Sequence, residues 1–278
     1  MDLTPIGVTG PADRRLVAGL HEIRPILDEL APAVLVVGGL MGRLWLHAVP
    51  IDMPARPTAD IDLGIDRRRL QIAANSRVVG PLLDRLGFRG GYLGEPFRYS
   101  KAVDGVGEVL LDIVVPPGTS REEPPLVERG LESVAAPGLA YAVLRGPVTA
   151  AVSFVDGEQS FDFHLPIPAL EAALVLKAAL VESGVRTRLD RVRSDSVDAI
   201  MLTAACLKRP DALRALRDHR RRSDVRKSIR WLTDAFRSPT AVGSRRVETH
   251  FEEDGYGPGA GRWAADVVSA FAAALEAD

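Results

Sequence analysis

Three aspartates stand at positions that suit metal-dependent chemistry. Asp60 and Asp62 lie two residues apart in the run ADIDLGID, and Asp112 interrupts the apolar run EVLLDIVV. In a strand, Asp60 and Asp62 would share one face, roughly 6–7 Å apart at the backbone, and the apolar residues would share the other. Two such carboxylates could share a divalent cation, which prefers hard oxygen ligands. Without a cation they would repel each other, and one would tend to stay protonated.

Asp112 lies in a run that otherwise indicates a strand buried on both faces. A lone ionised carboxylate there would cost several kcal/mol unless it were paired or bound to a metal. If this strand lies beside the Asp60 strand, three carboxylates meet at one end of the sheet. That is enough to hold one or two Mg²⁺ ions and to position a triphosphate. The alternative is that Asp112 only accepts a hydrogen bond from a backbone group or an arginine.

A short apolar run followed by two glycines precedes the first aspartates. Residues 34–37 are mostly β-branched and are bounded by glycine, which predicts a buried strand. Gly38 and Gly39 have no Cβ, so the backbone there can approach a ligand closely. Residues 40–48 are expected to form a helix. Its free N–H groups would point to the same place, which suits a phosphate.

A lysine and two further aspartates form a second candidate group. Lys177 falls on a helical stripe that is otherwise apolar. It either reaches water by snorkelling or enters a cleft and pairs with phosphate oxygens. Asp195 and Asp198 are three residues apart on the next predicted helix and would face the same way. The alternative is that they are acids of a first helical turn, favoured there by the helix dipole.

Composition limits the class of protein. With 278 residues, of which 46% are apolar, the chain can form one large domain or two moderate ones. The net charge of −2 excludes a protein that is basic over its whole surface, so a nucleic-acid contact needs a local patch. The single cysteine, Cys206, excludes an internal disulfide and fits a reducing compartment. It is expected at a packed helix position.

Several common signals are absent from the sequence. No apolar run approaches the roughly 20 residues that a membrane helix needs, and the segment MDLTPIGVTG lacks the apolar core of a signal peptide. The glycine-rich residues 255–261 are not followed by the Lys-Ser/Thr pair of a P-loop, and the histidines lack metal-ligand spacing. We therefore expect a cytoplasmic protein with no membrane partner.

The order of predicted elements indicates an α+β fold. Helices are expected at 13–30 and 66–86, where Gly80-Pro81 disfavours an uninterrupted second helix. Further strands are expected at 97–103, 108–115, 148–155 and 161–165, and further helices at 169–182, 190–207, 211–219, 224–236 and 262–275, with a loop at 238–261. Strand signals fade after Pro166 and Pro168. This predicts an α/β domain with a mixed sheet over 1–167 and a helical domain over 168–278 that completes the cleft.

Together the motifs resemble a known superfamily. They are VVGG at residues 36–39, RPTADIDL at 56–63, LDI at 111–113 and DSVD at 195–198. The first three resemble the DNA polymerase β-type nucleotidyltransferases. Arg-Pro-Thr before the aspartates, and Lys177 with Arg186 or Arg188 before DSVD, are similar to the AbiEii-type toxins, which include mycobacterial toxins that modify tRNA. The resemblance covers most of the chain up to about Leu202 and implies a nucleotidyltransferase-like fold for the first domain.

The resemblance implies a role for each matching position. Catalytic roles fall on Asp60, Asp62, Asp112, Lys177 and Asp195. Nucleotide contacts fall on Gly38, Gly39, Thr58, Lys177 and Asp198. In this assignment the first three aspartates bind one or two Mg²⁺ ions, and Asp112 also helps to activate the attacking hydroxyl. Lys177 holds phosphate oxygens, and Asp195 is the acid that the second domain contributes.

The implied reaction is attack of an acceptor hydroxyl on the α-phosphorus of an NTP, with release of pyrophosphate. The metal ions neutralise charge on the attacking and leaving oxygens. The resemblance implies a toxin that acts on the tRNA 3′ end and is neutralised by a cognate antitoxin protein. Two alternatives stay open. One is the same chemistry on a small acceptor such as an aminoglycoside or lincosamide antibiotic, and the other is a non-catalytic relative that only binds a nucleotide or a partner.

The acceptor prediction depends on one basic stretch. Residues 214–230, RALRDHRRRSDVRKSIR, are basic in a weakly acidic protein. They could track a nucleic-acid backbone, which favours an RNA acceptor over a small one. Equally, arginine on an exposed helix face is ordinary in a chain that uses arginine far more than lysine. The intact set of three aspartates counts against the non-catalytic alternative.

Overall fold

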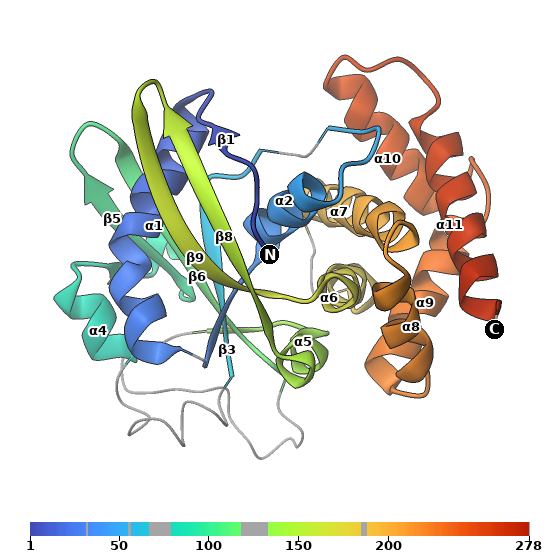
Figure 1. Ribbon diagram of the computed structural model, residues 1–278, viewed down its shortest axis with the longest axis horizontal. Coiled ribbons are helices and arrows are strands. Elements are labelled where there is room, and N and C mark those ends of the chain that lie inside the picture. Colours follow the sequence, from blue (N-terminus) through green and yellow to red (C-terminus); the bar gives the residue numbers. More distant parts are fainter. Residues whose placement is uncertain (32, 55–56, 67–78, 118–132, 185–187, 278) are drawn as a thin grey trace.

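The structure is a computed structural model that describes residues 1–278 except 32, 55–56, 67–78, 118–132, 185–187 and 278. It has an α+β fold with mixed sheets, as predicted. Figure 1 shows the strands and the first helices gathered on one side, and the helices that follow residue 169 gathered on the other.

The central sheet carries the predicted aspartates. Its described strands follow the order β2 (Val34–Val37), β3 (Asp60–Ile65), β6 (Gly107–Val115), β5 (Arg98–Val103) and β4 (Arg89–Gly90), and β7 (Val134–Ala135) also pairs with β6. β3 runs parallel to β6 and antiparallel to β2, while β5 runs antiparallel to β6. The strands predicted at 34–37, 97–103 and 108–115 are confirmed, with ends that differ by a residue at most.

A second sheet consists of β1 (Ile6–Gly7), β8 (Pro147–Asp156) and β9 (Gln159–Pro168). β8 and β9 form a long hairpin, and Gly157 adopts a positive φ of 62° in its tight turn, a conformation that favours glycine. The strands predicted at 148–155 and 161–165 are therefore confirmed, and both extend further than the sequence indicated. β9 lies against β2, which joins the hairpin to the central sheet.

Short and long helices cover the sheets. They are α1 (Pro11–Leu30), α2 (Gly38–Ala48), α4 (Val79–Arg85), the 3₁₀ helix η1 (Tyr92–Gly94) and α5 (Leu139–Arg145). α1 contacts β3, β6 and β9 and buries one stripe that includes Leu16, Leu20 and Ile23. Of the helix predicted at 66–86, residues 67–78 lie outside the described part. α4 begins at Val79, and Pro81 lies in its first turn, where a missing N–H is tolerated.

The C-terminal part is helical, as its composition predicted. It contains α6 (Leu170–Glu182), α7 (Leu189–Leu207), α8 (Pro210–Asp218), α9 (Ser223–Ala235), α10 (Val242–Glu253) and α11 (Ala260–Glu276). α6 packs between α7 and α9, and α7 also contacts α10 and α11. Cys206 is fully buried on α7, and burial raises the pKa of its thiol. The packed helix position expected for this residue is confirmed.

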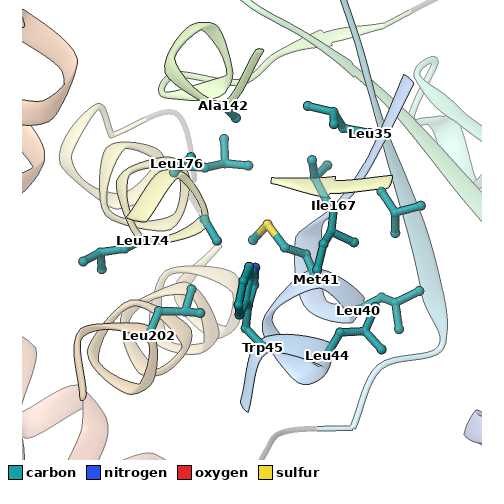
Figure 2. Packing of buried hydrophobic residues seen from close by; sticks show 14 of the residues in the cluster. Leu35, Leu40, Met41, Leu44, Trp45, Ala142, Ile167, Leu174, Leu176 and Leu202 are labelled. Carbon is teal, nitrogen blue, oxygen red and sulfur yellow. The ribbon is translucent and has the colours of Figure 1, made fainter. Parts of the chain in front are cut away.

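The core is continuous from the sheets to the helices. In Figure 2, the side chains of Met41 and Trp45 of α2 lie in the core between Ile167 of β9 and helix α6. The indole Nε1 of Trp45 donates a hydrogen bond to the carbonyl oxygen of Pro168, at 2.8 Å, where β9 passes into α6. α2 and α6 are therefore held together by buried side chains. The division of the chain into two domains at this junction stays a prediction.

Two helices depart from the sequence prediction. The loop expected at 238–261 is wrong over much of its length, because α10 occupies Val242–Glu253. Its buried face consists of small or isolated apolar residues, Gly243, Ser244, Val247 and Phe251, which give little periodic signal. α5 was also not predicted. It begins after Gly138, whose φ is 86°, and a Cβ there would lie 2.8 Å from the backbone of Leu176.

Candidate active site

A cavity of about 470 Å³ lies where the ends of β2, β3 and β6 meet α6 and α7. The predicted site residues that line it are Gly38, Gly39, Thr58, Asp60, Asp62, Asp112, Lys177 and Asp195. Its volume falls in the range of small-molecule sites, roughly 300–1,000 Å³. Asp198, the remaining predicted site residue, is not among the lining residues but forms an ion pair with Lys177, which is. The fold therefore gathers residues that the sequence spreads over more than half of its length.

Strand pairing puts the three aspartates on one face of the sheet. Asp62 and Asp112 are direct partners in the parallel pairing of β3 with β6, and Asp60 precedes Asp62 by one full period of the strand. Asp112 is buried, while Asp60 and Asp62 are half-buried at the cavity. The prediction that the Asp112 strand lies beside the Asp60 strand is confirmed.

The diglycine forms the start of α2 beside Asp62. Gly38 has a φ of 69°, and a Cβ built on it would lie 1.8 Å from Oδ2 of Asp62, so only glycine fits. The sequence predicted that the backbone at Gly38 approaches a ligand closely. In the structure this backbone lies against the carboxylate of Asp62. No side chain caps the first turn of α2, whose first two residues, Gly38 and Gly39, line the cavity.

Asp112 is held by an arginine that the sequence analysis did not single out. Arg98 Nε lies 2.7 Å from Oδ1 of Asp112, and Nη2 lies 2.6 Å from Oδ2, so both carboxylate oxygens accept a hydrogen bond. The two residues are direct partners in the antiparallel pairing of β5 with β6. The bond to Asp112 raises the pKa of Arg98, against the effect of burial. The arginine alternative considered for Asp112 is the arrangement found.

Arg98 also faces two other carboxylates. Its Nη2 lies 3.7 Å from Oδ2 of Asp60, and its Nη1 lies 2.9 Å from Oε2 of Glu95. Within the described residues, no group of three or more His, Cys, Asp or Glu side chains is arranged to hold a metal ion. Asp112 meets a guanidinium, and the other two predicted metal ligands, Asp60 and Asp62, line the same cavity.

Lys177 forms a buried cluster with the two aspartates of α7. Its Nζ lies 2.8 Å from Oδ1 of Asp195 and 2.8 Å from Oδ2 of Asp198. The lysine side chain is only 3% exposed, so the snorkelling alternative is wrong. Asp195 and Asp198 are buried in the middle of α7 and are not acids of its first turn, so that alternative is wrong too. Their burial is stabilised by the lysine charge.

Two arginines at the start of α7 complete the wall. Arg191 lies with Nη2 3.6 Å from Oδ2 of Asp60, and Arg188 pairs with Asp190 at 2.9 Å. Arg188 was part of the family resemblance, whereas Arg191 was not predicted. Arg191 stands among closely spaced arginines at 188, 191 and 193, which is common in this arginine-rich chain, so the sequence did not single it out. Arg56 and Arg186, which the resemblance also included, lie outside the described residues.

The basic stretch 214–230 spans α8, α9 and the turn between them. Its exposed arginines are Arg214, Arg220, Arg221, Arg226 and Arg230. Others are engaged in local ion pairs, such as Arg222 with Asp224 at 3.0 Å. The α8 and α9 surface therefore carries exposed positive charge, although part of the predicted basic character is neutralised locally.

Comparison with known proteins assigns no family to this geometry. No family model, no curated protein and no solved structure matches the chain. The resemblance to polymerase β-type nucleotidyltransferases and AbiEii-type toxins therefore stays a prediction that rests on the motifs. In the part of the chain that the structure describes, no helix is long and apolar enough to cross a membrane.

Proposed function

We propose that this protein is a nucleotidyltransferase that moves an NMP from an NTP to an acceptor hydroxyl and releases pyrophosphate. The observation that carries the proposal is the composition of one cavity wall. A helix start with uncapped N–H groups, two half-buried carboxylates and three arginines, Arg98, Arg188 and Arg191, face the same space. This combination suits a triphosphate, whose charge needs N–H donors and cations around it.

The reaction requires positioning more than covalent help from the protein. The acceptor oxygen attacks the α-phosphorus, the bond to the pyrophosphate oxygen breaks, and the hydroxyl proton is released. The start of α2 would bind phosphate oxygens through Gly38 and Gly39. Asp60 and Asp62 fit a Mg²⁺ ion, because both are hard oxygen ligands on the same face of β3. A bound ion there would supply charge neutralisation for the triphosphate.

Arg191 is expected to contact the nucleotide. It lines the cavity, it is 36% exposed, and its 3.6 Å approach to Asp60 is too long for a hydrogen bond. Arg191→Gln should weaken NTP binding about tenfold, because a charge-assisted hydrogen bond to phosphate is removed. Equilibrium binding of a fluorescent NTP analogue, measured without turnover, checks this. Arg193→Gln is the matched control, since Arg193 of the same helix pairs with Glu253 away from the cavity. Equal losses in both variants would contradict the assignment.

We propose RNA, and tRNA in particular, as the acceptor, because the exposed arginines of α8 and α9 suit a phosphate backbone. The double variant Arg221→Gln/Arg226→Gln should weaken tRNA binding. It should also reduce the slope of log affinity against log salt by about 0.7–0.9 for each phosphate group that an arginine no longer neutralises. Filter binding across a salt series measures both.

Arg14→Gln/Arg24→Gln removes the same charge from exposed positions of α1 and serves as the control. An affinity for tRNA that does not depend on salt would count against the acceptor proposal and favour a small-molecule acceptor. A cytoplasmic toxin with a cognate antitoxin is the biological role that we attach to this activity. Transfer from each labelled NTP to total tRNA in the presence of Mg²⁺ is its basic test.

A further inference from the structure

Asp60 and Asp112 contact the arginines around them very differently. Asp112 is buried and accepts two hydrogen bonds from Arg98, at 2.6 and 2.7 Å. Asp60 is 26% exposed, and its two neighbouring guanidinium groups, on Arg98 and Arg191, stay 3.7 and 3.6 Å away. The Asp112 carboxylate is thus fully paired with the Arg98 guanidinium, while the Asp60 carboxylate is accessible from the cavity.

Strand pairing holds the Arg98–Asp112 ion pair in place. Arg98 and Asp112 are direct cross-strand partners, so neither main chain can move away without breaking the pairing of β5 with β6. Glu95 holds the guanidinium from a third direction at 2.9 Å, and Arg98 is 8% exposed. A buried bidentate pair of this kind is costly to separate, because each partner would be left as an uncompensated charge.

The Arg98 guanidinium lies close to both carboxylates that a bridging ion would have to bind. Nη2 of Arg98 lies 2.6 Å from Oδ2 of Asp112 and 3.7 Å from Oδ2 of Asp60. A Mg²⁺ ion shared by these two oxygens would need to be about 2.0–2.1 Å from each, so it would lie within roughly 5 Å of the same nitrogen. Two cations at that separation repel each other strongly. A metal site of three carboxylates therefore does not fit this wall.

We infer that the site binds one divalent ion, on Asp60 and Asp62, and that Arg98 replaces a second ion at Asp112. This inference rests on the proposed nucleotidyl transfer and specifies its cofactor requirement. Asp112 is then a positioning residue that holds Arg98 in place. The fixed guanidinium supplies positive charge at the cavity wall without any exchange of ions with solvent.

Binding of Mn²⁺ to the full chain, followed by the electron paramagnetic resonance signal of the free ion, tests the inference. The wild-type chain should bind one Mn²⁺. Asp60→Asn and Asp62→Asn should each weaken that binding at least tenfold, whereas Asp112→Asn should change it less than about threefold. Asp104→Asn, in the exposed turn between β5 and β6, is the control for the loss of one acidic group. Two ions per wild-type chain, or an Asp112→Asn loss as large as that of Asp60→Asn, would overturn the inference.

Arg98→Gln provides a second variant that does not depend on how well Asp112→Asn folds. Without the guanidinium, Asp112 becomes available, so Mn²⁺ should bind at least several-fold tighter or at a second position. Unchanged binding in a variant whose circular dichroism spectrum is native would also overturn the inference. Failure of the proposed function gives a different pattern: one Mn²⁺ bound through Asp60 and Asp62, with no NMP transfer to any acceptor. Transfer with two bound ions would leave the function standing and remove only this inference.

Discussion

Asp60→Asn is expected to lower NMP transfer by about 10³-fold while leaving the fold intact. The loss of one ligand of the proposed ion removes several kcal/mol of charge stabilisation in the transition state, and each 1.36 kcal/mol is a factor of ten in rate. Asparagine keeps the volume of the side chain, and Asp60 makes only long contacts with Arg98 and Arg191. The measurement is the initial rate of label transfer, together with the thermal unfolding midpoint of each protein.

The matched control is Asp104→Asn, since Asp104 lies exposed in the turn at the far end of β5 and β6. Its transfer rate should stay at the wild-type level. If the protein acts as a toxin, expression of the wild type should slow growth, and Asp60→Asn should relieve this effect. Full transfer activity in Asp60→Asn would remove the catalytic role of the aspartates.

Lys177→Met is expected to produce the largest loss of stability. Lys177 is the cation between Asp195 and Asp198, and all three side chains are less than 8% exposed. Removing one partner of a buried ion pair typically costs about 3–5 kcal/mol, because the remaining charge is left in the interior. Urea unfolding followed by circular dichroism should show a lower midpoint and an unchanged slope.

Two further variants make this result specific. Lys227→Met removes an exposed lysine from α9 and should change the free energy of unfolding by no more than about 0.5 kcal/mol. Adding Asp195→Asn and Asp198→Asn to Lys177→Met should restore part of the stability, because the buried negative charges disappear with their partner. Wild-type stability in Lys177→Met would show that the two carboxylates do not need this cation. It would then leave Lys177 available for the phosphate contact that the sequence predicted.

Local sequence patterns were enough to place the aspartates. The alternation in ADIDLGID and the apolar character of EVLLDIVV predicted two strands, and the helix predicted at 40–48 is α2, which begins two residues earlier, at Gly38. Each of these signals lies within a few consecutive residues. The sequence also raised the possibility that the two strands are neighbours, whereas their parallel direction and the register that brings Asp62 opposite Asp112 come from the structure.

The partners of the charged residues could not be predicted in the same way. The bond between Arg98 and Asp112 depends on the register of β5 against β6, which no local pattern fixes. The cluster of Lys177 with Asp195 and Asp198 depends on the packing of α6 against α7. In both cases the sequence indicated that a buried charge needed a partner, and only the fold shows which one it has.

The most direct test of the central claim follows the two ends of the nucleotide separately. The wild-type chain is incubated with Mg²⁺, total tRNA and each NTP in turn, labelled either at the α-phosphate or at the γ-phosphate. Nucleotidyl transfer predicts that α-label, but not γ-label, becomes attached to RNA, with one pyrophosphate released for each transfer. Attachment of γ-label, or release of inorganic phosphate without any transfer of α-label, would contradict nucleotidyl transfer to RNA.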